Sequence, residues 1–307
     1  MNNERVIVGT TPPCRRGKKG GGESKVINVE PIEKIIKCVL ASGKLEDERP
    51  LSGIIVAPVE CGKTTLIRKH CLRSHQVFYT TDATAFGIIR DTDNLKLLSP
   101  NGEVTHIVIP DLLTCFGRKA ETVNTFIHFM NSLIEEGVVN ISTYAVHIKS
   151  PIAEVKAGLI TAIPPGPFSD KRRHWKRIGF LSRALPISYD YNAITEMDIF
   201  SYIEDQKHLA ERLQALQLGK KPKKIILPTN LAKSLEPLAI RIAANLSKKT
   251  DVFGDDRDTL HGFRSQRQLQ TFAKALALLD GKDEVDKGCI KEVMRLSEFL
   301  NLDGNKV

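Results

Sequence analysis

Residues 53–66 form the stretch Gly-Ile-Ile-Val-Ala-Pro-Val-Glu-Cys-Gly-Lys-Thr-Thr-Leu, which decides the fold. Residues 53–57 predict a buried strand, and the residues after Lys63 predict a helix. The loop between them is typical of phosphate binding, in which backbone N–H groups meet phosphates at a helix N-terminus, a lysine reaches the β- and γ-phosphates and a threonine hydroxyl ligates Mg²⁺. The sequence therefore predicts a nucleotide site, with a plain structural turn as the alternative. The loop comprises Ala57, Pro58, Val59, Glu60, Cys61, Gly62, Lys63, Thr64 and Thr65.

Apolar and amphipathic segments alternate on either side of this loop. A helix is expected at 31–42, and further strands at 77–81, 106–110, 158–164 and 186–191, with helices near 83–90 and 121–136 between them. This alternation predicts an α/β fold with a mostly parallel sheet and flanking helices. After residue 192 only helices are expected, at 195–217, 228–247, 263–280 and 286–300. We therefore predict a flexible basic tail (1–25), an α/β nucleotide-binding domain (26–193) and an all-helical domain (194–307).

Asp111 directly follows the apolar strand expected at 106–110. A carboxylate in that position commonly orders the magnesium ion of a bound nucleotide, which gives Thr64 and Asp111 as the metal-binding pair. The alternative is that Asp111 caps the segment that follows it.

Together these segments resemble the AAA+ division of P-loop ATPases, over roughly residues 53–300. The resemblance implies that Thr161 is a polar sensor and that the helical domain is a lid. Leu181-Ser182-Arg183 is similar to the arginine-finger segment of minichromosome-maintenance helicases and MoxR-type ATPases, so that Arg183 would reach the γ-phosphate in a neighbouring subunit. Arg267, with Arg264 as a substitute, is similar to the second sensor. Both arginines could equally be ordinary surface residues.

One position departs from that family. A glutamate that activates water usually follows the aspartate, but here the next residue is Leu112. Either hydrolysis is slow or absent, or another carboxylate supplies the base. Asp82 is one substitute, unless it caps a helix starting at Ala83. Glu60 is another, although its position in the loop would aim it outward.

The composition narrows the possible partners. The net charge of +9 points to anionic partners, and three basic runs support nucleic acid. They lie in the tail, at residues 171–177 around the only tryptophan, Trp175, and at Lys220, Lys221, Lys223 and Lys224. After the Pro-rich residues 164–167, the second run is expected to project as a loop that could stack Trp175 on an unpaired base or meet a neighbouring subunit.

Two further features bear on where the protein acts. No apolar stretch reaches the length of a membrane span, so we expect a protein without membrane segments. The six scattered cysteines form neither a disulfide framework nor a zinc site, which favours the cytoplasm.

These expectations combine into one leading hypothesis, an ATP- and Mg²⁺-binding ATPase of AAA+ type that assembles into homo-oligomers and acts as a motor or switch on DNA, in replication, packaging or a mobile-element system. The first alternative is a nucleotide-dependent scaffold or adaptor that hydrolyses ATP weakly and recruits a protein partner. The second is a MoxR-type chaperone that remodels proteins.

Overall fold

The computed structural model describes residues 28–90, 104–138, 140–143, 146–149, 156–204, 216, 218–219, 221–248 and 260–307. The predicted tail at residues 1–25 and Lys220 lie outside this part of the chain. So does most of the helical segment expected after residue 204.

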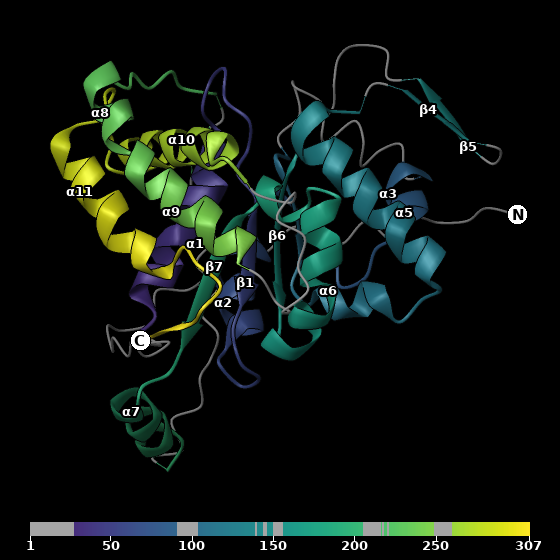
Figure 1. Ribbon diagram of the computed structural model, residues 1–307, viewed down its shortest axis with the longest axis horizontal. Helices are drawn as coiled ribbons and strands as arrows, with labels where there is room; N and C mark the ends of the chain where they lie inside the picture. The colour runs from purple at the N-terminus through teal and green to yellow at the C-terminus, as the bar shows by residue number, and fades with distance from the viewer. Residues whose placement is uncertain are drawn as a thin grey trace, which may run out of the picture.

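A parallel sheet forms the centre of the molecule (Figure 1). Its strand order is β2-β3-β6-β1-β7-β8, and every pair of neighbours is parallel. The strands are β1 (Gly53–Val56), β2 (Val77–Tyr79), β3 (His106–Ile109), β6 (Gly158–Ile163), β7 (Leu185–Asp190) and β8 (Asn305–Lys306). All residues of β1, β3 and β6 are buried, which is why these strands are continuous apolar runs in the sequence. The predicted α/β fold with a parallel sheet is confirmed.

Helices flank the sheet on both sides. In Figure 1, α5 and α6 lie to the right of β1, β6 and β7, whereas α1, α9, α10 and α11 lie to the left. The helices that precede β7 are α1 (Glu30–Ser42), α2 (Lys63–Cys71), α3 (Ala85–Arg90), α5 (Ala120–Asn131) and α6 (Pro165–Arg177). Shorter helical turns cover Leu112–Phe116 (η1), Ser132–Glu136 (η2) and Leu181–Arg183 (η3).

The helices after β7 are α7 (Ala193–Glu204), α8 (Thr229–Ser234), α9 (Glu236–Ser247), α10 (Phe263–Leu279), α11 (Lys287–Leu296) and the turn η5 (Ser297–Phe299). Of these, α9, α10 and α11 share their core with the sheet, whereas α8 buries no residue and α7 buries only Thr195. α10 packs against both α1 and α9, and the buried residues of all three belong to one contiguous apolar cluster. The chain then returns to the sheet as β8, which pairs with β7 at Tyr189 and Asp190.

Three local structures differ from the sequence prediction. The strand β8 was not expected, because only helices are expected after residue 192. The antiparallel hairpin of β4 (Asn140–Thr143) and β5 (Val146–Lys149) was not expected. The prediction of a projecting loop at 171–177 is wrong. These residues belong to α6, which begins at Pro165 because proline is well suited to a first helical turn. Trp175 is 1% exposed and packs between Phe168, Phe180 and Phe116, so it cannot stack on a base.

Within the described residues, no helix is both long enough and apolar enough to cross a membrane.

Candidate functional site

Lys63 is the first residue of α2 and its side chain folds back over the preceding loop. Its Nζ donates hydrogen bonds to the carbonyl oxygens of Ala57, at 2.8 Å, and Pro58, at 2.5 Å. Partial burial lowers the pKa of Lys63, while the nearby Cys61 and Asp111 act in the opposite direction. The ammonium group is thus fixed against the loop backbone, near enough to Asp111, the predicted magnesium carboxylate, to feel its charge.

The backbone of the loop takes up two left-handed conformations. Glu60 has φ of 70° and Gly62 has φ of 69°, on either side of Cys61. Alternation of right- and left-handed residues turns successive N–H groups toward one point, which creates a concave anion site. A side chain at Gly62 would also approach the hydroxyl of Tyr191 to 3.2 Å, so this position requires glycine. No side chain caps the start of α2, which leaves the N–H groups of its first turn directed at the loop.

Two residues of β7 that the sequence analysis missed hold the loop in place. The buried hydroxyl of Tyr189 donates a 2.6 Å hydrogen bond to the carbonyl oxygen of Cys61. Asp190 lies 3.7 Å from the Cys61 thiol through Oδ1 and binds Lys306 of β8 through Oδ2. Burial raises the pKa of Cys61, so the thiol stays protonated. In the sequence, only two features could have pointed to these residues: the strand is the last one before the helical region, and polar residues Tyr-Asp-Tyr follow its apolar part at 189–191.

Asp111 follows β3, which lies two strand positions from β1, and both strands point the same way. Asp111 and the loop therefore lie at the same, carboxyl end of the sheet. The Oδ1 of Asp111 accepts a hydrogen bond from the backbone N–H of Leu113, at 3.0 Å, so Asp111 caps η1 as the alternative interpretation predicted. The next residue, Leu112, is fully buried in the core. Thr161 belongs to β6, between β1 and β3, and is fully buried, with no hydrogen-bond partner for its hydroxyl in the described part of the chain.

The structure does not bring Asp82 to the loop. β2 is three strand positions from β1, which corresponds to roughly 14 Å at about 4.8 Å per strand. Both carboxylate oxygens of Asp82 bind Arg118, and this pairing lowers the pKa of Asp82. Nor does Asp82 cap a helix at Ala83, because α3 begins at Ala85 and the N–H of Gly87 binds the hydroxyl of Thr84. Glu60 is exposed, as expected of a side chain aimed outward.

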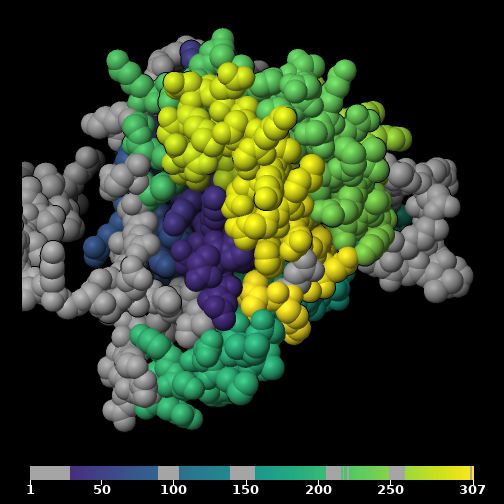
Figure 2. Space-filling view, turned by 90° about the vertical axis from the view of Figure 1, so that its left-hand side faces the viewer, coloured from purple at the N-terminus to yellow at the C-terminus, as the bar shows by residue number. Residues whose placement is uncertain are grey.

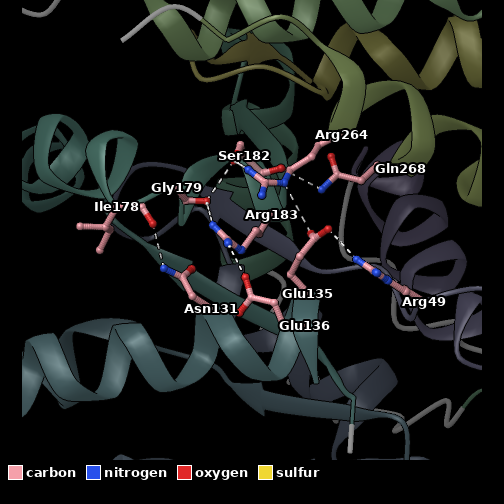
Figure 3. A network of polar contacts seen from close by, with 10 residues as sticks. All are labelled: Arg49, Asn131, Glu135, Glu136, Ile178, Gly179, Ser182, Arg183, Arg264 and Gln268. Carbon is pink, nitrogen blue, oxygen red and sulfur yellow. Dashed lines mark hydrogen bonds and ion pairs between the residues drawn. The ribbon is translucent and has the colours of Figure 1, made fainter. Parts of the chain in front are cut away.

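The predicted arginine finger lies at the opposite end of the sheet from the loop. Figure 3 shows the polar network around it. Arg183 lies two residues before β7, and its guanidinium donates to the carbonyl oxygen of Gly179, at 2.9 Å, and to Oε1 of Glu136, at 3.1 Å. Only 10% of the Arg183 side chain is exposed. Because β1 and β7 are parallel neighbours, the loop after β1 and the residue before β7 lie at opposite ends of the same strands. Arg183 therefore cannot reach the loop of its own chain.

Arg264 belongs to the same cluster. Its Nη1 donates to the hydroxyl of Ser182, at 3.1 Å, and its Nε lies 3.7 Å from Glu135. Figure 3 shows Glu135 between Arg264 and Arg49. Arg267 lies one turn further along α10 and is exposed; with Arg49, Arg183 and Arg264 it lines a cavity of about 230 Å³. The structure thus places Arg267 with Arg183 and away from loop residues 57–65.

The basic residues of α6 lie on the surface around the buried Trp175. Lys171, Arg173 and Arg177 are exposed, whereas Arg172 is half-buried and donates to the carbonyl oxygen of Asn245. Across the described residues, no group of three or more His, Cys, Asp or Glu side chains is arranged so that it could hold a metal ion.

No protein-family model matches this chain, and no curated protein does either.

Proposed function

We propose that the protein binds a nucleoside triphosphate with Mg²⁺ at loop residues 57–65 and acts as an oligomeric ATPase of AAA+ type. The observation that carries this proposal is the loop itself. Lys63 is fixed over Ala57 and Pro58, two left-handed residues concentrate N–H groups, and the start of α2 has no side-chain cap. Left-handed residues also occur in ordinary turns, but their combination with a lysine beside an uncapped helix start is what an anion bound there would use.

The residues present fit a magnesium nucleotide. Lys63 would contact the phosphates, and Thr64, exposed in the first turn of α2, would ligate the metal together with Asp111. The bound Mg²⁺ would supply charge neutralisation for the phosphates. Asp111 uses Oδ1 for its cap, so Oδ2 is the oxygen that we assign to this role. ATP is the expected nucleotide only through the resemblance to AAA+ proteins.

The placement of Arg183 supports assembly. Since it cannot reach the loop of its own chain, a role at a γ-phosphate requires a second copy that presents its loop to the amino end of this sheet. Arg267 would act from the same end, because it lines the same cavity as Arg183. In this arrangement each nucleotide would lie between two subunits, so the proposed sensor and finger would both belong to the neighbour.

One observation favours the weakly hydrolysing scaffold as a second candidate. Leu112 occupies the position where most AAA+ proteins have the glutamate that activates water, and it is fully buried in the core. Asp82 is paired with Arg118 at a distant strand. We therefore expect slow turnover unless a neighbouring subunit contributes a carboxylate.

DNA remains the proposed partner, on the strength of charge. Because Trp175 is buried, it cannot stack on a base, and DNA would be bound through its phosphates by the exposed cations of α6. Binding of this kind weakens steeply with added salt, because counterions are released on association. A Lys171→Glu variant is expected to weaken DNA binding and reduce its salt dependence; a salt-insensitive or absent interaction would favour a protein-remodelling chaperone or a scaffold.

The experiment that tests the nucleotide site compares Lys63→Ala with Lys287→Ala. Lys287 is also the first residue of a helix, α11, but follows no such loop. Titration of a fluorescent ATP analogue with Mg²⁺ should give binding to the wild type and to Lys287→Ala, and a loss of at least about 100-fold in Lys63→Ala, equivalent to about 2.7 kcal/mol. Equal affinity in all three proteins would contradict the site. Competition with GTP measures base preference in the same assay.

A further inference from the structure

α7 is an apolar helix that is almost entirely exposed. Four large apolar residues, which we call the α7 surface, are each more than 60% exposed: Ile194, Met197, Phe200 and Ile203. Their spacing of three residues winds them around about half of the helix circumference, at about 3.6 residues per turn. A helix whose apolar residues cover half of its circumference normally packs that face against other residues, yet Thr195 alone is buried in α7. Figures 1 and 2 both show α7 projecting from the rest of the molecule.

The charge of α7 is of one sign. Glu196, Asp198 and Glu204 are exposed, and α7 contains neither lysine nor arginine. A surface that binds α7 should therefore combine apolar residues with positive charge. A lipid surface does not fit, because bilayers attract basic rather than acidic amphipathic helices.

A second apolar surface with the required charge occurs on the same chain. Phe263 is 76% exposed and stacks on His261 at 5.7 Å, and Ile240 of α9 is 55% exposed. We call these three residues the Phe263 patch. They lie together because Gly262, in a left-handed conformation, turns tightly against the backbone of α9: a Cβ there would lie 3.5 Å from the N of Ile240. Arg264 directly follows Phe263 and Arg267 lies one turn further along α10; with Phe263 they line a hollow of about 400 Å³.

The two surfaces lie at opposite ends of the sheet. α7 begins three residues after the carboxyl end of β7. The Phe263 patch adjoins Ser182, three residues before the amino end of β7, through the hydrogen bond from Arg264. Since one copy cannot bring the two together, contact between them must join different copies. Opposite ends produce a head-to-tail contact, which closes into a ring or continues as a filament.

We propose that the α7 surface docks on the Phe263 patch of a second copy of this chain. Phe200 and Met197 contact Phe263 and Ile240 of the neighbour, and Glu196 and Asp198 face its Arg264 and Arg267. The contact specifies which surfaces of the proposed assembly meet, but it needs no bound nucleotide. It also turns the loop end of one copy toward the Arg183 end of the next.

The decisive experiment mixes two variants, each of which lacks one of the two surfaces. Phe200→Asp damages the α7 surface and Phe263→Asp damages the Phe263 patch; both side chains are exposed, so neither change disturbs the core. Sedimentation velocity over a concentration series should show association of the wild type. Each variant alone should associate at least about 30-fold more weakly, the loss typical of one central apolar residue in an interface. An equimolar mixture should form a dimer and nothing larger, because one intact pair of surfaces remains.

Several outcomes would overturn this proposal. They are a wild type that stays monomeric with and without Mg²⁺ and ATP, single variants that associate like the wild type, and a mixture that forms no dimer. If only Phe200→Asp abolishes association, α7 pairs with α7. If Phe200→Asp lowers Tm without changing association, another segment of the same chain covers α7. Phe86→Asp on α3, an exposed phenylalanine outside both surfaces, is the matched control and should behave like the wild type.

A cross-linking measurement gives an independent test of the same contact. A photoreactive residue placed at position 200 should cross-link to residues 261–264 of an isotopically labelled second copy. Repeating both experiments in Lys63→Ala separates this proposal from the nucleotide site. Docking should persist there, so its loss only in Phe200→Asp and Phe263→Asp concerns these surfaces and not the loop.

Discussion

Arg183 and Glu136 form an ion pair, 3.1 Å between Nη2 and Oε1, that joins two segments 47 residues apart in the sequence. The pair holds the guanidinium at the amino end of the sheet, with a second hydrogen bond to the carbonyl oxygen of Gly179. In the absence of a bound phosphate, the carboxylate of Glu136 is therefore the anionic partner of Arg183. In an assembly, a neighbour's γ-phosphate would replace one anionic partner with another, so Arg183 would not need to lose its charge compensation.

Replacement of Arg183 separates its structural role from its proposed catalytic role. Arg183→Ala is expected to lower nucleotide turnover by about 10³-fold, as other arginine fingers do, while the Kd of the nucleotide changes by less than about threefold. Glu136→Gln removes the ion pair but leaves the hydrogen bond from Arg183 to the carbonyl oxygen of Gly179, so this variant should retain most of the turnover. Steady-state hydrolysis and nucleotide titration measure the two quantities; full turnover in Arg183→Ala would show that the residue is structural.

Tyr189→Phe tests whether β7 holds the nucleotide loop. The variant removes the buried hydrogen bond to the carbonyl oxygen of Cys61 and leaves that oxygen without its partner. We expect a loss of about 1–2 kcal/mol in the free energy of unfolding and a severalfold weaker nucleotide affinity. Tyr191→Phe is the matched control and should change either quantity little. Denaturant titrations give the stability, and unchanged affinity in Tyr189→Phe would show that the loop holds its shape without this bond.

Glu33 predicts how stability depends on pH. Its carboxylate lies 2.5 Å from Lys69 and 3.4 Å from His70 on α2, with 12% of its side chain exposed. Burial alone would raise its pKa, but the contacts with His70 and Lys69 outweigh burial and lower the pKa to about 2 from the ordinary 4.5. A depressed carboxylate pKa adds stability above pH 4.5 that is lost as the pH falls toward 2, on the order of 3 kcal/mol in total.

The test of this pH dependence is Glu33→Gln. The variant should be about 3 kcal/mol less stable than the wild type at pH 7, because it leaves Lys69 buried without its partner. The difference should shrink between pH 4.5 and 2. Urea unfolding at several pH values measures it, and a constant difference over that range would contradict the assignment.

Asp82→Asn tests the distance between β2 and the loop. Because Asp82 lies three strand positions from β1 and is bound by Arg118, we expect turnover within about twofold of the wild type. The stability loss should stay below about 1 kcal/mol, since both partners are substantially exposed. If this variant lost turnover while its fold stayed intact, Asp82 would be the catalytic base and the distance argument would be wrong.

The sequence predicted the elements that depend on local pattern. The strands β1 and β3 could be found because both of their faces are buried, which leaves uninterrupted apolar runs. The strand–loop–helix order around residues 57–65 could be predicted, because the apolar run of β1 and the glycine before Lys63 indicate where the strand ends and α2 begins. α10 was predicted within one residue, since its apolar residues recur at helical spacing.

Features that depend on strand order could not be predicted. No local pattern reveals that β2 is an edge strand, and this determines the distance of Asp82 from the loop. The pairing of Arg183 with Glu136 likewise depends on how η2 and η3 meet in space. Trp175 was misassigned because six basic or histidine residues surround it in sequence, although its spacing of seven from Phe168 places both aromatic rings on one helix face.

The burial of Trp175 provides an internal optical reporter. It is the only tryptophan in the chain, and its indole packs against Phe180, three residues before Arg183. The tryptophan fluorescence of the unmodified protein therefore comes from one position next to the proposed finger. If Arg183 exchanges Glu136 for a neighbour's phosphate, as proposed, a displacement of Phe180 would change the wavelength or intensity of this emission. Stopped-flow fluorescence with selective excitation of tryptophan would then follow the exchange without an added label.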